Sequence, residues 1–331
     1  MTGERQAPAN QYFLVSTICR GSQLNEPSGN LYIVDPERGV QSSCPVPSPP
    51  HLHRELNPRG GIRGGRGLAV GEETIYVANG SEVLHFDQSW RIITEISHPW
   101  CGNIHDIALH DGHLWVCSTA NDALAQFDSG GNLLDMIDLR PAGGLTGDTS
   151  RFAKSIDYRD PAGYPLKTSN LLHVNGIGFN THGSLLATLG RSEAEDSMCR
   201  RGLIAKADEN ELPILIADDV AVPIHNVLPM ASGTILTLDT GAGELLVLRS
   251  DGKVIKSLDL APPAPRSFLR GLCWAGNSLL LVGERNRLLV VDLNMAVTTS
   301  LLTLSESPLE AVYSITPLPK GFEPLPKSLA T

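Results

Sequence analysis

One pattern recurs along the chain: a polar residue, a small residue, an apolar strand, a turn and a second apolar strand. It appears as RGLAVGEETIYVA at 66–78 and again as HDIALHDGHLWVCS at 105–118. Further copies begin at Asn175, His225, Arg270 and Tyr313. Repeats of about 40–50 residues are typical of folds in which each unit buries its apolar surface against its neighbours.

Each complete hairpin is followed by a third apolar segment, as in EVLHFD at 82–87, ALAQFD at 123–128, GELLVLRSDG at 243–252 and RLLVVDL at 287–293. A fourth often follows, as in RIITEIS, LLDMIDL, KVIKSLDL and VTTSLLTL. Four short strands per unit, separated by turns such as Asp-Gly and Gly-Asn, predict the blades of a β-propeller.

The two ends of the chain each carry part of a blade. The sixth copy stops after one strand, whereas the N-terminal region supplies FLVSTI, NLYIVD and GVQSSCPV, which have the pattern of strands two to four. Sharing one blade between the termini closes the ring and covers sheet edges that would otherwise promote aggregation. We therefore expect an all-β, six-bladed propeller as a single domain over 11–319, with loosely ordered tails at 1–10 and 320–331.

Composition agrees with this fold and excludes several partners. The 32 Gly and 23 Pro supply turns, and the formal net charge of −10 with no basic run excludes nucleic acid as a partner. No stretch approaches the ~18 apolar residues of a membrane helix, and the N-terminus lacks the basic and apolar segments of a signal peptide. We expect a cytoplasmic monomer or small homo-oligomer with no membrane partner, and reduced, mostly buried cysteines because none of the six forms a C-x-x-C pair.

The residue that begins each inner strand is a candidate for function. In a propeller these strands line the central channel, and they begin at one mouth, where ligands usually bind. The leading residue is polar in all six copies: Arg66, His105, Asn175, His225, Arg270 and Tyr313. A narrow channel without a function more often carries small or apolar side chains there.

Three histidines are candidates for metal ligation. His173 lies two residues before Asn175, so strand alternation places both on one face. His105, His173 and His225 are then expected to converge from adjacent blades, where neutral imidazoles suit a divalent transition metal such as Zn, Fe or Cu. The alternative is that each histidine binds a backbone group or water. The histidines that do not share this register are expected in turns or at the surface: His85, His98, His110, His113 and His182.

Two arginines and a tyrosine complete the predicted catalytic set. Arg66 and Arg270 would repel each other without an anion between them, which favours a substrate carboxylate. The alternative is an ion pair with a neighbouring acid such as Asp106 or Glu284. Close cations would let the Tyr313 phenol move a proton, although an aromatic plug of the channel is an equal alternative.

Two long connections are expected to cover the mouth. Residues 141–172 precede the third inner strand, and residues 43–65 lead to Arg66. Loops beyond ~15 residues are uncommon in compact domains unless they serve as lids or binding loops. The predicted substrate contacts are Asn175, Tyr158 and Glu284, with Lys154, Asp157 and Arg159 as weaker candidates; His51 and His53 have sequence positions from which they could reach the mouth.

Two segments resemble a known family. HDIALHDGHLWVCSTANDALAQFD together with LLHVNGIGF resembles a bacterial six-bladed propeller family of conserved hypothetical proteins with His-Asp-Ile and His-x-Asn-Gly strand starts. The resemblance implies the fold and no particular reaction.

The axial residues are similar in kind to those of peptidyl-hydroxyglycine amidating lyase, a six-bladed propeller with three histidines on zinc and with arginine and tyrosine at the axis. They differ in spacing, because the lyase histidines come from alternate blades. Calcium-dependent propeller lactonases use Glu, Asn and Asp ligands, so Asn175, Asn103 and Glu284 leave calcium as a weaker alternative.

These observations lead to two hypotheses for function. The first is a metal-dependent enzyme acting on a small anionic organic substrate, of lyase, cyclase or hydrolase type. Its metal would polarise an oxygen, Arg66 and Arg270 would hold a carboxylate, and Tyr313 would move a proton. The second is a non-catalytic propeller that binds a ligand or a protein partner; a metal-dependent oxidative enzyme is a further alternative.

Overall fold

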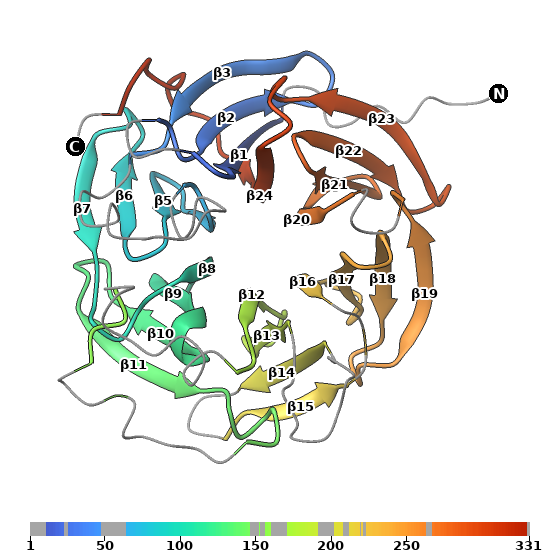
Figure 1. Ribbon diagram of the computed structural model, residues 1–331. Coiled ribbons are helices and arrows are strands. Elements are labelled where there is room, and N and C mark those ends of the chain that lie inside the picture. Colours follow the sequence, from blue (N-terminus) through green and yellow to red (C-terminus); the bar gives the residue numbers. More distant parts are fainter. Residues whose placement is uncertain are drawn as a thin grey trace.

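The six predicted sheets form a ring around a central axis (Figure 1). The computed structural model describes residues 11–22, 26–47, 64–145, 152, 156–159, 171–190, 202–207, 212–218, 220, 223–262 and 267–329. Every sheet has four antiparallel strands, and the strand that begins each blade lies at the axis (Figure 1). The all-β, six-bladed prediction is confirmed.

The blades are numbered here in chain order. Blade 1 contains β4 (Leu68–Val70), β5 (Thr74–Ala78), β6 (Val83–Asp87) and β7 (Ile92–Ile96). Blade 2 contains β8 (Ile104–His110), β9 (His113–Ser118), β10 (Ala123–Phe127) and β11 (Leu133–Asp138). Blade 3 contains β12 (Val174–Phe179), β13 (Leu185–Leu189), β14 (Leu203–Ala207) and β15 (Ile214–Ala217).

The remaining blades follow the same plan. Blade 4 contains β16 (Ile224–Pro229), β17 (Ile235–Asp239), β18 (Glu244–Leu248) and β19 (Val254–Asp259). Blade 5 contains β20 (Leu269–Gly276), β21 (Leu279–Glu284), β22 (Arg287–Asp292) and β23 (Val297–Thr303). Blade 6 contains β24 (Glu310–Leu318), β1 (Tyr12–Cys19), β2 (Asn30–Asp35) and β3 (Gly39–Pro45).

Blade 6 closes the ring as predicted, with the strand order β24-β1-β2-β3. The buried carboxylate of Glu310 fastens it: its Oε1 accepts hydrogen bonds from Thr17 Oγ1 (2.5 Å), Asn30 Nδ2 (2.9 Å) and the Tyr32 hydroxyl (2.8 Å). The last strand is thereby joined to the first two through side chains as well as through the backbone ladder.

The hydrophobic core lies between the blades. Period-two alternation sends Leu14 into the cluster shared with blade 1 and its neighbours Phe13 and Val15 into the cluster shared with blade 5. Each of the other blade pairs buries a comparable cluster. Both faces of a blade are therefore buried, which explains why the inner strands have nearly continuous apolar sequence.

Three features differ from the sequence expectations. The quoted repeats do not locate β14 and β15, the outer strands of blade 3. The segment after β24 packs against the ring, with Leu325 and Leu329 buried in the cluster between blades 6 and 1. His85, expected in a turn or at the surface, is buried in β6 and stacks on Tyr76 with ring centres 4.2 Å apart.

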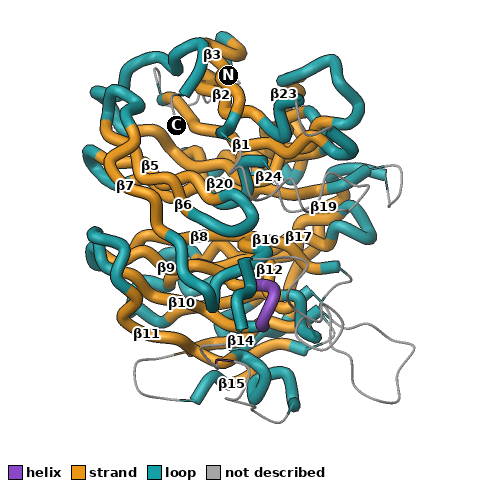
Figure 2. Tube along the Cα trace, turned by 60° about the vertical axis from the view of Figure 1, so that its left-hand side comes forward, coloured by secondary structure: helices purple, strands orange, loops and turns teal. Residues whose placement is uncertain are grey.

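Other features of the described residues agree with expectation. Strands dominate in Figure 2, where one short 3-10 helix, Thr119–Asn121, is marked. None of the described residues forms a helix long and apolar enough to cross a membrane. The five described cysteines are free thiols, and four of them are buried, as predicted. The expected N-terminal tail, residues 1–10, lies outside the described residues.

Candidate functional site

The starts of the inner strands carry irregularities that aim their polar side chains at the axis. The pairing register shifts in five blades: between Ile104 and Ile107, Val174 and Gly176, His225 and Val227, Arg270 and Leu272, and opposite Tyr313 between Ser16 and Thr17. A bulge of this kind turns a side chain away from the regular alternation and is common beside functional sites.

Seven residues meet around the axis, and we call them the axial cluster. They are Arg66, Asn103, His105, His173, His225, Arg270 and Tyr313. Six of them were candidates from the sequence; Asn103 was considered there only as a calcium ligand. Because each blade contributes at least one residue, the closed ring is needed to assemble the cluster.

The two arginines share the tyrosine. The guanidinium carbon of Arg270 lies 3.5 Å from the centre of the Tyr313 ring, and that of Arg66 lies 5.5 Å from it. Arg66 Nη1 donates to the Tyr313 hydroxyl (3.4 Å) and to Asn103 Oδ1 (3.2 Å). Burial lowers the pKa of Arg270 to about 10, and the charge of Arg66 acts in the same direction, so the Arg270 guanidinium remains protonated at neutral pH.

His105 is held as a neutral imidazole with a defined tautomer. Arg270 Nη2 lies 3.4 Å from His105 Nδ1, and a guanidinium can only donate, so Nδ1 accepts and the ring proton sits on Nε2. Burial, followed by His173 and the two arginines, holds the pKa of His105 well below its usual value. His105 therefore presents a donor to its surroundings.

His225 has the opposite tautomer. The Thr240 hydroxyl lies 2.7 Å from His225 Nδ1 and gives its own proton to the Leu269 carbonyl, 2.8 Å away. Thr240 must then accept from His225 Nδ1–H, which leaves Nε2 unprotonated. Burial and the nearby Arg270 hold the pKa of His225 well below its usual value. His225 Nε2 is therefore free of a proton and can accept one.

The buried carboxylate of Asp122 fixes the backbone at His173. Asp122 accepts hydrogen bonds from the backbone N–H groups of Leu171 (2.7 Å), Leu172 (3.0 Å) and His173 (3.0 Å). His173 has a φ of 56°, an uncommon conformation for a non-glycine residue that these bonds help to hold. Its ring meets that of His105 edge-on, with centres 4.7 Å apart.

The acids named as alternative partners for the arginines bind elsewhere. Asp106 accepts from the backbone N–H groups of Ile107 (3.0 Å) and Ile177 (3.3 Å), which ties blade 2 to blade 3. Burial raises the pKa of Asp106 to about 7. Glu284 is paired with Arg287 in its own blade. Arg270 has no ion pair within the described part of the chain.

The three predicted substrate contacts have other surroundings. Asn175 Oδ1 accepts from Thr188 Oγ1 (2.9 Å) on the neighbouring strand, and its buried Nδ2 has no partner among the described residues. Glu284 is held by Arg287 as above. Tyr158 is 1% exposed and packs on Ala120. The structure brings none of the three into a described contact with the axial cluster, and their binding roles stay predictions.

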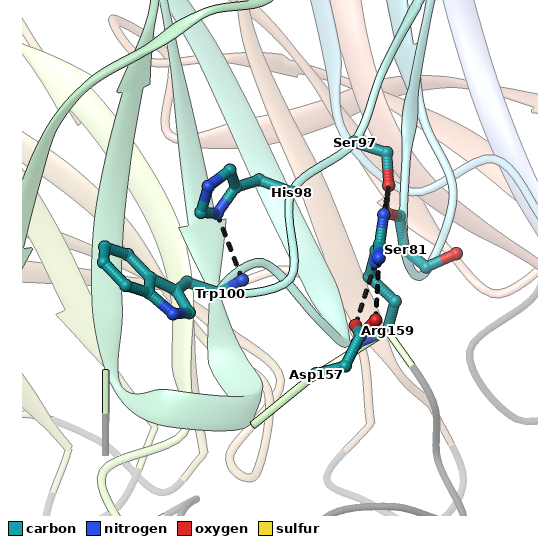
Figure 3. Close-up of polar contacts among 6 residues, drawn as sticks. All are labelled: Ser81, Ser97, His98, Trp100, Asp157 and Arg159. Atoms are coloured by element: carbon teal, nitrogen blue, oxygen red, sulfur yellow. Dashed lines mark hydrogen bonds and ion pairs between the residues drawn. The ribbon is translucent and has the colours of Figure 1, made fainter. Parts of the chain in front are cut away.

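Residues 156–159 of the long 141–172 connection dock beside blade 2. Tyr158 N donates to the Pro99 carbonyl (2.6 Å), and a Cβ at Gly102 would overlap the Tyr158 carbonyl. Figure 3 shows the polar contacts next to this point: Arg159 binds Asp157 in two places and reaches Ser97 Oγ at 3.4 Å. The docked segment thus fixes the loop that leads into Asn103 and His105.

The histidines fit a three-histidine metal site poorly. Within the described residues, no group of three or more His, Cys, Asp or Glu side chains is placed to hold a metal ion. His105 Nδ1 faces a guanidinium, and Nε2 carries the proton in that arrangement. The oxygens of Asn103, Asn175 and Glu284 have separate partners, so they do not gather around calcium either. These contacts do not test metal binding directly, and the metal stays a prediction from the sequence. His51, His53 and Lys154 lie outside the described residues.

Sequence reasoning missed the residues that orient the cluster. Thr240 orients His225 and Asp122 presents His173, but a threonine and an Asn-Asp pair at strand ends carry no distinctive signal. Phe268 and Arg20 also lie beside the cluster: the rings of Phe268 and His225 are 5.4 Å apart, and Arg20 stacks on Phe268. Only the fold brings these distant positions together.

The chain has no match among protein-family models or curated proteins, so the resemblance to a bacterial propeller family is not confirmed.

Among solved structures, the chain is similar to one in a nidogen/laminin complex, with 13% identity, coverage of 92% of this chain and 98% of that one, and a TM-score of 0.61. A protein of unknown function from Bacteroides caccae has 12% identity, coverage of 93% and 98%, and a TM-score of 0.60. A streptogramin B lyase has 12% identity, coverage of 74% and 70%, and a TM-score of 0.51. At these identities the similarity shows a common fold, so the chain is a six-bladed β-propeller that shares its architecture with a chain of the nidogen/laminin complex and with a streptogramin B lyase.

Proposed function

We propose that this chain is an acid–base enzyme of lyase type that acts on a small, carboxylate-bearing substrate at the axis. One observation carries the proposal: Arg270 is 7% exposed, stacks on Tyr313, touches His105 and has no ion pair among the described residues. A buried guanidinium needs an acceptor for its remaining N–H groups, and a carboxylate matches its planar geometry.

The other members of the axial cluster supply proton transfer. His225 has an unprotonated Nε2, held in that state by the Thr240 hydroxyl, and suits a general base. The hydroxyl of Tyr313 receives a hydrogen bond from Arg66 and suits a general acid. The cluster contains no Ser, Cys or carboxylate side chain, which favours proton transfer over a covalent acyl or glycosyl intermediate.

These groups define a balanced elimination. His225 Nε2 removes a proton from the carbon next to the substrate carboxylate, while Arg66 and Arg270 stabilise the negative charge that develops on the carboxylate. The electron pair forms a carbon–carbon double bond as the group on the next carbon leaves. Tyr313 gives its hydroxyl proton to that leaving group, and proton exchange with solvent restores both residues.

The test is turnover of small hydroxy- and amino-carboxylates, followed by the ultraviolet absorbance of a double bond conjugated to a carboxylate. We expect the wild-type protein to produce that signal with at least one compound and Arg270→Gln to abolish it. Arg249→Gln is the matched control, because Arg249 is exposed and paired with Asp251 on an outer turn. Carboxylate binding without turnover would contradict the enzyme proposal and favour the non-catalytic binding propeller.

A further inference from the structure

Asn175 carries a buried hydrogen-bond donor that has no acceptor in the described part of the protein. The residue lies on β12, the inner strand of blade 3, and is 1% exposed. Its Oδ1 accepts from Thr188 Oγ1 (2.9 Å), whereas its Nδ2 has no partner among the described residues. A buried N–H group without an acceptor is costly, so its presence in a folded protein calls for an explanation such as a ligand.

The unpaired amide lies beside a member of the axial cluster. A Cβ at Gly190 would lie 2.6 Å from Asn175 Nδ2 and 3.4 Å from His173 Cδ2, so both atoms border the same point. The His173 ring in turn meets that of His105 edge-on, with centres 4.7 Å apart. The donor of Asn175 is therefore next to His173, at the blade 3 side of the cluster.

Blade 4 has an acceptor at the position where blade 3 has none. Away from the bulges, β12 and β13 pair in the same register as β16 and β17. Counted along these hairpins, Asn175 occupies the position of His225, and Gly190 that of Thr240. The Thr240 hydroxyl accepts from His225 Nδ1 (2.7 Å), but a glycine offers Asn175 no side-chain acceptor. The acceptor for Asn175 must then come from outside the described chain.

The amide selects the kind of group that can pair with it. Nδ2 can only donate, so its partner must be an acceptor. A hydroxyl oxygen meets this requirement, whereas a substrate ammonium can only donate and would leave Nδ2 unpaired. A buried donor of this kind discriminates between ligands, because an analogue without the acceptor leaves the donor unsatisfied in the complex.

We infer that the substrate is a hydroxycarboxylate whose hydroxyl oxygen accepts a hydrogen bond from Asn175 Nδ2 while Arg270 holds its carboxylate. The inference rests on the proposed function for the carboxylate and adds the oxygen substituent. It assigns Asn175 as a specificity residue that selects a hydroxyl over an amino group.

Titration calorimetry with defined probes tests this inference. Propionate is the unsubstituted probe, 3-hydroxypropionate and lactate carry a hydroxyl, and β-alanine and alanine carry an ammonium at the same positions. The measured quantity is the Kd of propionate divided by that of each substituted probe. We expect at least one hydroxyl probe to bind wild-type protein about 10-fold more tightly than propionate, and its amino counterpart to show no such advantage.

Two variants remove the donor in different ways. Asn175→Ala deletes the amide, and Gly190→Ala introduces a Cβ that overlaps Nδ2 and displaces it. Both should lower the hydroxyl advantage from about 10-fold to near one. Gly130→Ala, in an exposed outer turn, is the matched glycine control and should keep the wild-type ratio.

The outcomes separate this inference from the proposed function. If Arg270→Gln loses propionate binding but no hydroxyl probe binds wild-type protein better than propionate, the role of Asn175 is wrong and the carboxylate site stands. A preference for the amino probes would show that the amide presents its oxygen, and would overturn the inference. A hydroxyl advantage that persists in both variants would also overturn it, because another residue would then bind the oxygen. If no carboxylate binds wild-type protein, the proposed function fails as well.

Discussion

The guanidinium carbon of Arg270 lies 3.5 Å from the centre of the Tyr313 ring, although the two residues belong to neighbouring blades that close the ring. The same tyrosine also contacts a second buried cation, because Arg66 Nη1 donates a hydrogen bond to its hydroxyl. The positive charges of Arg66 and Arg270 repel each other in the free protein, and a bound anion would offset this repulsion.

Replacement of Arg270 should therefore separate binding from folding. Arg270→Gln is expected to weaken carboxylate binding about 10- to 100-fold, the equivalent of the ~1.5–3 kcal/mol of a charge-assisted hydrogen bond. Its melting temperature should change by less than ~4 °C, because relief of the repulsion from Arg66 offsets the lost stacking. Calorimetry and thermal unfolding give the two values, and a large loss of stability with unchanged binding would contradict this role.

Thr240 should control the tautomer of His225. In Thr240→Val the His225 Nδ1–H loses its acceptor, and we expect kcat/KM to fall on the order of 100-fold. Thr240→Ser keeps the hydroxyl and should restore most of the activity. Nitrogen NMR of the labelled histidines reports the tautomer independently of turnover, and an unchanged His225 signal in Thr240→Val would show that Thr240 does not position the base.

Acid should destabilise the protein through its buried histidines. Burial lowers the pKa of His85 below its usual value of 6.5, and both of its ring nitrogens lack partners among the described residues. As pH falls below about 6.5, the unfolded chain binds a proton that folded His85 does not, so stability decreases from that point downward. His105 and His225 act in the same direction.

His85→Phe tests this account, because phenylalanine retains a stacked ring against Tyr76 and removes the unpartnered nitrogens. We expect an increase of about 1–3 kcal/mol in the free energy of unfolding at pH 7 and a shallower loss of stability between pH 7 and 5. His182→Phe, in an exposed turn, is the control. An acid dependence identical to that of the wild type would refute the assignment to His85.

Metal content distinguishes a three-histidine metal site from the acid–base cluster of the proposed function. Because His105 Nδ1 faces Arg270, we expect purified protein to contain less than one transition-metal ion per chain and to keep its carboxylate affinity after treatment with a chelator. Elemental analysis measures the first and calorimetry the second. One Zn, Fe or Cu per chain that disappears from a His105→Ala, His173→Ala, His225→Ala variant would establish the metal site predicted from the sequence.

The repeats made the fold predictable because the same polar–small–apolar start recurs at each inner strand, from Arg66 to Tyr313. They also indicated which side chains meet at the axis, because a ring brings equivalent positions together. The bulges that turn these residues, and the hydroxyl of Thr240 that fixes His225, depend on contacts between distant segments. Tyr158 illustrates the limit: a tyrosine in a long loop suggested a ligand contact, but its docking on Pro99 and Gly102 is visible only in the fold.

The axial cluster is complete only after blade 6 has formed. Tyr313 is carried by β24, the last strand of the chain, and Glu310 on the same strand fastens that strand to Thr17 and Tyr32. During synthesis the strands of blades 1 to 5 emerge before Tyr313, the residue that stacks on Arg270. Under the proposed function, activity therefore requires ring closure, and we expect a chain truncated before β24 to show no turnover even where its other blades fold.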